Sequence, residues 1–326
     1  MVLSAAAVLA LIACQEDPGG TIPEVPDTSN PSFDGGPQPT TDGSTPSDPD
    51  ASDPVDASDP ADANDAADAN DAGPKLNALF AHIGGKLVSV NPDTGAITEA
   101  GTADQPFTGA WDANAKITRV IIGPYTPLGG TPTPRLGTMD ICTGTITPGP
   151  AITLGGNQVR RAESLVQDPV TGTFWISVGT TGSSANTEFT TERVGTVDVT
   201  TGIVTQVGQH ATYQNDGDSM TFIESKLHLM DVATAINSGG LYELNPTNAA
   251  ATKVAESGPD VRRMAWDASR SLLFVTYGKG VGTMRSIQTM NPATGALTKL
   301  GPDLDDATYP GVHFGALFVA PKPVCP

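Results

Sequence analysis

The chain has 326 residues, a formal net charge of −19 at pH 7 and 38% hydrophobic residues. Residues 1–75 carry 15 acidic side chains against one Lys, for a net charge of −14, whereas residues 76–326 carry 21 acidic against 16 basic side chains, for −5. Neither part has the basic face that nucleic-acid binding requires, so we exclude DNA and RNA as partners. The C-terminal part, of about 250 residues, is long enough for one domain with a sizeable core.

The first 13 residues are predominantly apolar and precede Cys14. This run is shorter than the ~20 apolar residues that span a bilayer, and it is typical of the hydrophobic region of an export signal. Leu11-Ile12-Ala13-Cys14 resembles the lipobox of bacterial lipoproteins, and the resemblance implies that Cys14 is lipidated and becomes the first residue of the mature protein. The alternative is an ordinary signal peptide with an incidental cysteine, because residues 1–13 contain no Lys or Arg. Gln15 follows the cysteine where an Asp would argue for inner-membrane retention; we therefore expect the outer membrane or cell surface, with the periplasm as the alternative.

Residues 14–75 combine the cysteine with a spacer rich in Asp, Pro, Ala and Ser, in which Asp recurs at every third position from Asp50 to Asp71. Such a composition cannot bury enough apolar surface to offset the entropy of ordering, so we expect a disordered, self-repelling spacer. Calcium binding is the alternative, but the ligand spacing of a calcium loop is missing here. We expect no cofactor.

Residues 76–326 repeat one turn five times, at Asn91–Gly95, Asp140–Gly144, Asp198–Gly202, Asn245–Ala249 and Asn291–Gly295. Asn or Asp opens a turn by accepting backbone hydrogen bonds, and Gly supplies the left-handed residue that closes a short antiparallel connection. In the fourth copy Ala249 replaces Gly, and we expect a shift of register there, because Asn248 tolerates positive φ. Each turn lies between two extended runs, and two further runs complete each period.

Four strands in each period of ~40–50 residues are typical of a propeller blade. The region begins with a second strand near Leu76–Ile83 and ends with a first strand near Val312–Ala320, so the C-terminal strand should complete the first blade. The sequence therefore predicts a monomeric all-β domain, a five-bladed propeller of four-stranded antiparallel blades. The repeats resemble those of bacterial β-propeller proteins, a resemblance specific to architecture and not to activity.

Cys142 and Cys325 remain after lipidation of Cys14. Cys142 lies in the repeated turn of the second blade, and Cys325 follows the closing strand by a tail long enough to reach it. Because export favours disulfides, a Cys142–Cys325 disulfide and two free thiols are both open.

The longest and most variable connections join second to third strands and one blade to the next, and these share one face of a propeller. Loops on a rigid scaffold usually carry binding, so we place the candidate site on this face. The hypothesis is a charged funnel in which Arg side chains bind a carboxylate, phosphate or acidic peptide; local ion pairing is the alternative. The funnel residues are Arg160, Arg161, Arg262, Arg263, Asp216, Asp218, Asp260, His313 and Tyr309.

The leading interpretation of function is a lipid-anchored binding or interaction module whose ligand is a protein, peptide or glycan. No metal-ligand or nucleophile motif occurs, and we assign no catalytic residue. A propeller hydrolase or lyase is the alternative, with acid–base candidates Glu163, Asp216, Asp218, Asp260 and His313. A further alternative is a structural envelope protein. Trp111, Trp266 and Trp175 are interpreted as blade core in preference to sugar-stacking platforms.

Overall fold

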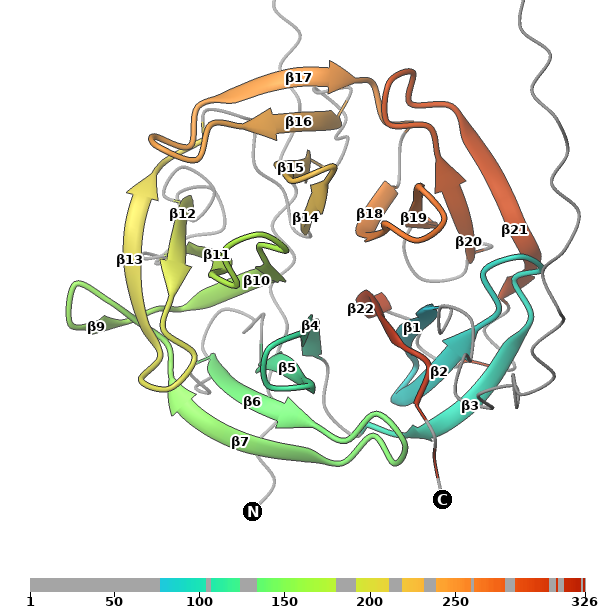
Figure 1. Cartoon of the computed structure of the whole chain (residues 1–326), viewed down its shortest axis with the longest axis horizontal. Helices are drawn as coiled ribbons and strands as arrows, with labels where there is room; N and C mark the ends of the chain where they lie inside the picture. Colours follow the sequence, from blue (N-terminus) through green and yellow to red (C-terminus); the bar gives the residue numbers. More distant parts are fainter. Residues whose placement is uncertain are drawn as a thin grey trace, which may run out of the picture. The chain divides into compact units, whose positions relative to one another are not determined.

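The computed structural model describes residues 77–103, 107–123, 134–179, 192–210, 219–231, 239–258, 261–278, 285–304, 309, 314–323 and 325. All regular elements in these ranges are strands, and they form five small sheets, each with an antiparallel four-stranded blade, arranged as a ring (Figure 1). The predicted five-bladed propeller is therefore confirmed.

Each blade contains four strands in hydrogen-bonded order from the channel outward. Blade 1 is β22 (Phe314–Pro321), β1 (Asn77–Ile83), β2 (Lys86–Val90) and β3 (Ile97–Thr102). Blade 2 is β4 (Phe107–Asp112), β5 (Ile117–Ile122), β6 (Arg135–Met139) and β7 (Ile146–Ala151). Blade 3 is β10 (Arg161–Gln167), β11 (Phe174–Gly179), β12 (Glu192–Val197) and β13 (Ile203–Gly208). Blade 4 is β14 (Ser219–Ile223), β15 (Lys226–Asp231), β16 (Gly240–Leu244) and β17 (Ala251–Ala255). Blade 5 is β18 (Val261–Asp267), β19 (Leu272–Tyr277), β20 (Arg285–Met290) and β21 (Leu297–Leu304).

The C-terminal strand closes the ring, as predicted. β22 pairs with β1, with Phe318 opposite Phe80, and the two rings stack with their centroids 5.5 Å apart. A strand from the end of the chain thus covers an edge that β1 would otherwise expose. Cys142 and Cys325 form a disulfide, which ties the segment after β22 to the outer turn of blade 2.

Five apolar clusters hold the blades together, one at each interface between neighbouring blades. Between blades 1 and 2, for example, Phe80 and Phe318 pack with Val120 and Met139. Because both faces of each sheet pack against a neighbour, most strand residues near the channel are buried regardless of alternation.

The repeated turn also explains why blades pack closely at their outer edges. Gly95 has φ +68°, and a Cβ at this position would collide with the Leu300 carbonyl of blade 5. Gly144, Gly202 and Gly295 make equivalent approaches to the preceding blade. In the fourth copy the prediction was wrong, because Ala249 itself takes φ 59° and donates its amide to the Asn245 carbonyl at 2.8 Å. Gly208 of blade 3 lies against this turn, where a Cβ would meet the Asn248 carbonyl, as Gly101 of blade 1 lies against the turn of blade 2.

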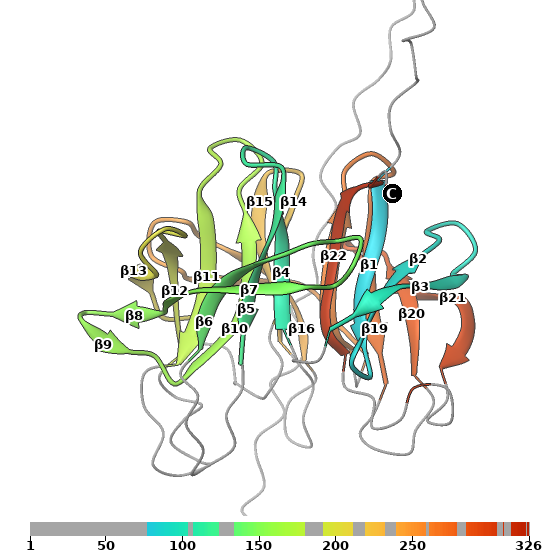
Figure 2. The ribbon, with the colours of Figure 1, turned by 90° about the horizontal axis from the view of Figure 1, so that it is seen from below.

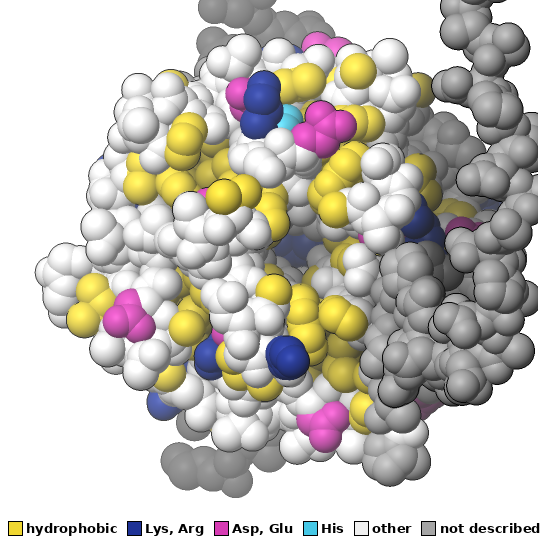
Figure 3. Space-filling model, in the orientation of Figure 1, with side chains coloured by type: hydrophobic (Ala, Val, Ile, Leu, Met, Phe, Trp, Pro, Cys, Tyr) yellow, Lys and Arg dark blue, Asp and Glu magenta, His cyan; other side chains and the backbone are white. Residues whose placement is uncertain are grey.

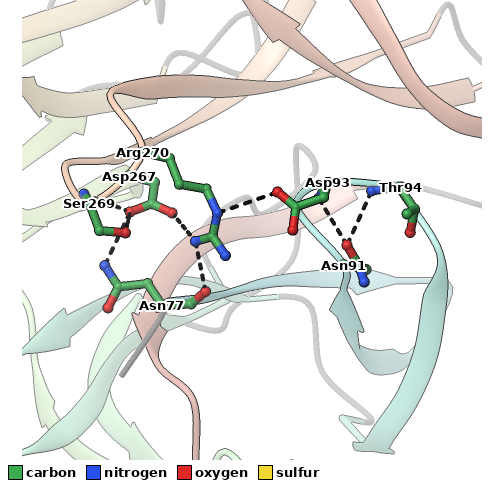
Figure 4. Close-up of polar contacts among 7 residues, drawn as sticks. All are labelled: Asn77, Asn91, Asp93, Thr94, Asp267, Ser269 and Arg270. Atoms are coloured by element: carbon green, nitrogen blue, oxygen red, sulfur yellow. Dashed lines mark hydrogen bonds and ion pairs between the residues drawn. The ribbon is translucent and has the colours of Figure 1, made fainter. Parts of the chain in front are cut away.

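Arg270 joins blade 5 to blade 1 beside the closing strand (Figure 4). Its guanidinium donates to Asp267 Oδ2 at 2.7 Å and to the Asn77 carbonyl at 3.1 Å, and it lies 3.6 Å from Asp93 Oδ1. Asp267 also accepts a hydrogen bond from the side-chain amide of Asn77 at 3.2 Å. Several charge-assisted hydrogen bonds therefore fix the inner and outer turns of the two blades relative to each other.

A hairpin between blades 2 and 3 was not predicted from the sequence. β8 (Thr153–Leu154) and β9 (Asn157–Gln158) are joined by Gly155 and Gly156, and β8 pairs in parallel with β13. Both glycines have positive φ, at 58° and 80°. A Gly-Gly pair between two short extended runs is a hairpin signal, and it could have been recognised.

Candidate functional site

The innermost strands of all five blades surround a cavity of about 430 Å³ in the central channel. Its lining comes from the C-terminal halves of β4, β10, β14, β18 and β22, from the turns that follow β4, β10, β14 and β18, and from Asn77 at the start of β1. In the side view these short turns lie together at one end of the ring (Figure 2). Figure 3 looks onto that face and shows a hollow at its centre with hydrophobic side chains around it. The volume falls in the ~300–1,000 Å³ range of small-molecule sites.

Two tryptophans line this cavity from equivalent positions, Trp111 in β4 and Trp266 in β18. Both are half-buried: Trp111 packs against the cluster between blades 1 and 2, and Trp266 against the one between blades 4 and 5. Trp175 in β11 is 7% exposed and belongs to the cluster between blades 3 and 4. The prediction that the tryptophans belong to the blade core therefore holds for Trp175. Trp111 and Trp266 pack against the core and also line the cavity.

The cavity wall also carries polar groups, because each innermost strand is the edge of its sheet. Side chains of neighbouring blades bind some of the backbone amides of this edge. Ser164 Oγ accepts a hydrogen bond from the Met220 amide at 2.7 Å, and Thr221 Oγ1 accepts one from the Trp266 amide at 3.3 Å. Thr221 is one of the cavity-lining residues, and its hydroxyl, an acceptor in this hydrogen bond, still has a hydrogen to donate. Gln167 and Asn77 line the same wall, but their side-chain amides already form hydrogen bonds within the protein.

A charged cluster occupies the opposite end of the channel. Glu163 lies in a bulge of β10, three residues before Val166 of the cavity wall, or ~10 Å along a strand. Arg161 forms an ion pair with Glu163 on the same strand. At this end of blade 3 the register places Gly179 between Arg161 and Glu192, and Ser177 donates its hydroxyl to Glu192. Bulges commonly redirect side chains in this way beside functional sites.

His210 and Arg263 complete the charged cluster, which we define as Arg161, Glu163, Ser177, Glu192, His210 and Arg263. His210 Nε2 lies 3.9 Å from Glu192 Oε2. Arg263 belongs to blade 5 and donates to the Glu163 carbonyl of blade 3 at 3.2 Å, so its side chain crosses the channel between blades that are not neighbours. Lys and Arg side chains are visible at the bottom of the hollow in Figure 3. The charged cluster therefore narrows the channel below the cavity.

Burial changes the acid–base properties of this cluster. Glu163 is 4% exposed, and burial raises its pKa to about 7, helped by the charge of Glu192 and opposed by Arg161 and Arg263. His210 is 1% exposed, and burial lowers its pKa to about 4 although the charge of Glu163 favours the protonated form. At neutral pH Glu163 is therefore partly protonated and His210 is neutral.

The structure places only some of the predicted funnel residues in the charged cluster. Arg161 and Arg263 belong to the charged cluster, Arg160 is exposed, and Arg262 is half-buried. Tyr309 packs against the cluster between blades 1 and 5. Asp216, Asp218, Asp260 and His313 lie outside the described residues, as do Cys14 and the spacer. The funnel as a whole stays a prediction.

Glu192 and Ser177 were not singled out from the sequence. They lie in different strands, and only the antiparallel register of β11 and β12 brings them to Glu163. Within the described ranges no group of three or more His, Cys, Asp or Glu side chains is placed to hold a metal ion. In the part of the chain that the structure describes, no helix is long and apolar enough to cross a membrane.

No protein-family model and no curated protein sequence matches the chain. Solved structures with a similar fold include a proposed exo-β-1,3-galactanase from Bifidobacterium bifidum s17, at 12% identity and a TM-score of 0.47, covering 69% of this chain and 83% of that one. A gluconolactonase from Xanthomonas campestris has 13% identity and a TM-score of 0.41, with 67% and 69% of the two chains covered. A proposed 6-phosphogluconolactonase from Bacteroides fragilis has 12% identity and a TM-score of 0.40, with 76% and 98% covered. Similarities this low give no information about activity.

Proposed function

We propose that the chain is an exported ligand-binding module, anchored to the outer membrane or the cell surface through lipidated Cys14 and carried on the Asp-rich spacer. The ligand is held in the central channel, in the cavity beside Trp111 and Trp266. The observation that carries the proposal is this cavity itself, about 430 Å³ in volume and bounded by the first strands of all five blades. A concave, mostly apolar site with a few convergent polar groups is typical of small-molecule binding.

The open mouth of the cavity follows from the lengths of the connections. The turns after β4, β10, β14 and β18 contain only a few residues, such as residues 113–116 and 268–271. Such short turns do not reach over the channel, so a ligand can enter from this face. The loop-face funnel predicted from the sequence would lie at the other end of the channel, beyond the charged cluster.

The binding proposal can be tested with a neutral naphthalene dye that fluoresces more strongly in an apolar site. The full chain carrying Cys14→Ser should bind one dye molecule saturably. Ala268 is exposed at the rim of the cavity, and Ala268→Trp should block binding. Ala293 is an exposed alanine in an outer turn of blade 5, and Ala293→Trp is the matched control that should bind normally. Equal binding by both variants, or no saturable binding at all, contradicts the proposal.

Anchoring is tested separately. Metabolic labelling with an alkyne fatty acid should label the wild-type chain and the Cys142→Ser variant but not Cys14→Ser. Label that persists in Cys14→Ser contradicts lipidation at this residue.

A second candidate function is acid–base catalysis at the charged cluster. This function is favoured because Glu163, which has a pKa of about 7, lies in one cluster with Glu192 and His210. A carboxylic acid that keeps its proton near neutral pH can donate it to a leaving group. We expect such an enzyme to release 4-nitrophenol from one of a panel of 4-nitrophenyl glycosides, and Glu163→Gln to abolish the release. Unchanged turnover in Glu163→Gln excludes this role for the residue.

A further inference from the structure

We infer that the ligand of the cavity is a neutral saccharide, with Trp111 and Trp266 as its stacking surfaces. This inference rests on the proposed function, since it names the ligand class of the same site. It combines the charge of the wall, the two indole side chains and the polar edges of the strands.

The charge of the wall argues against an anionic ligand. Of the described lining residues only Glu224 is charged, and it is exposed in the turn after β14. Arg161 and Arg263 lie deeper, where Arg161 is paired with Glu163 and Arg263 contacts the Glu163 carbonyl. A phosphate or carboxylate entering from the short-turn face would therefore lose hydration without meeting a cation in the cavity wall.

The indoles suit a ligand with both apolar and polar surfaces. Trp111 and Trp266 come from blades 2 and 5, on either side of blade 1, whose Phe318 also lines the cavity. Both are half-buried against blade-interface clusters, so packing holds the rings in place before a ligand arrives. Rigid aromatic rings offer a large contact area at a small entropic cost, and the C–H faces of a sugar ring can stack on them.

The polar groups of the wall favour a saccharide over a purely apolar ligand. Thr221 brings a hydroxyl to the same space, and the first strands add backbone groups because each is the inner edge of its sheet. The side-chain amides of Gln167 and Asn77 are already hydrogen-bonded within the wall. A hydrocarbon in this cavity would leave each such group that faces it without a partner, and each would lower the affinity by about 5- to 150-fold. Sugar hydroxyls can donate to and accept from them.

The experiment measures binding of neutral disaccharides to the full chain carrying Cys14→Ser, by calorimetry, with a uronic acid and choline as charged comparators. We expect at least one neutral disaccharide to bind with one site per chain, and to compete with the naphthalene dye. Trp111→Phe and Trp266→Phe keep an aromatic ring in the core but shorten the stacking surface, and each should weaken binding about tenfold. Thermal melting shows whether each variant is folded.

The rim variant keeps the inference testable if a tryptophan variant does not fold. Ala268→Trp should abolish disaccharide binding, whereas Ala293→Trp should bind like the parent chain. If the dye binds but no neutral disaccharide does, or if the uronic acid or choline binds more tightly, the saccharide inference is overturned and the binding function stands. If neither dye nor disaccharide binds, both fail.

Discussion

Glu163→Gln tests the electrostatics of the charged cluster, because glutamine resembles the protonated side chain and cannot ionise. Burial raises the pKa of Glu163 from its ordinary value of 4.5 to about 7. The folded state therefore retains a proton that the unfolded chain releases between these values, and stability falls as the pH rises through this window. Since one pKa unit corresponds to about 1.4 kcal/mol, the wild type should lose about 2–3 kcal/mol from this residue between pH 5 and pH 8.

The assay is urea unfolding followed by tryptophan fluorescence at the two pH values. His210 acts in the opposite direction, because its lowered pKa of about 4 makes the folded state lose stability as the pH falls below 6.5. This contribution is present in both proteins, so the comparison isolates Glu163. Glu99→Gln, at an exposed ion pair with Lys86, is the control and should follow the wild type. If Glu163→Gln shows the same pH dependence as the wild type, the account of the cluster is wrong.

Three further predictions concern the ring. Cys142→Ser should lower the free energy of unfolding by about 2–5 kcal/mol, because the disulfide closes a long loop of the unfolded chain; the wild type in reductant should match the variant, and equal stability with and without reductant contradicts this role. Arg270→Gln should cost about 1–3 kcal/mol in thermal unfolding, since Asp267 stays buried with fewer donors; an unchanged melting temperature would show that Arg270 is dispensable for closure. Gly95→Ala should cost at least about 1 kcal/mol through its left-handed φ and its contact with blade 5, and urea unfolding at the level of the wild type would argue against this packing.

The architecture could be predicted because each blade repeats the same turn sequence, which specifies its hairpin locally. The turn from Asn291 to Gly295 fixes a hairpin through a side-chain cap and a left-handed glycine. Five such turns, with the unpaired strands at the two ends of the region, were enough to predict blade number and closure. The left-handed Ala249 was misjudged because the hydrogen bond from its amide to the Asn245 carbonyl keeps the turn in the form of the other copies without glycine, which the residue type does not reveal.

The candidate sites were less accessible from sequence. The contact between Arg263 and Glu163 joins residues 100 positions apart across the channel, and no local pattern indicates which blades face each other there. The variable loops drew attention to one face, whereas the cavity of the described residues lies at the other. Short turns leave that mouth open, and Trp111 and Trp266 reach it only because the ring brings equivalent strand ends together.

The most direct test of the channel as the ligand site is ¹⁹F NMR of the full chain carrying Cys14→Ser and 5-fluorotryptophan, titrated with the disaccharide or dye that binds. The chain has three tryptophans, and a Trp→Phe variant of each assigns its resonance. We expect the Trp111 and Trp266 resonances to shift with a common saturation curve, while that of Trp175, buried between blades 3 and 4, stays in place. A saturable ligand that leaves Trp111 and Trp266 unmoved would show that binding occurs elsewhere.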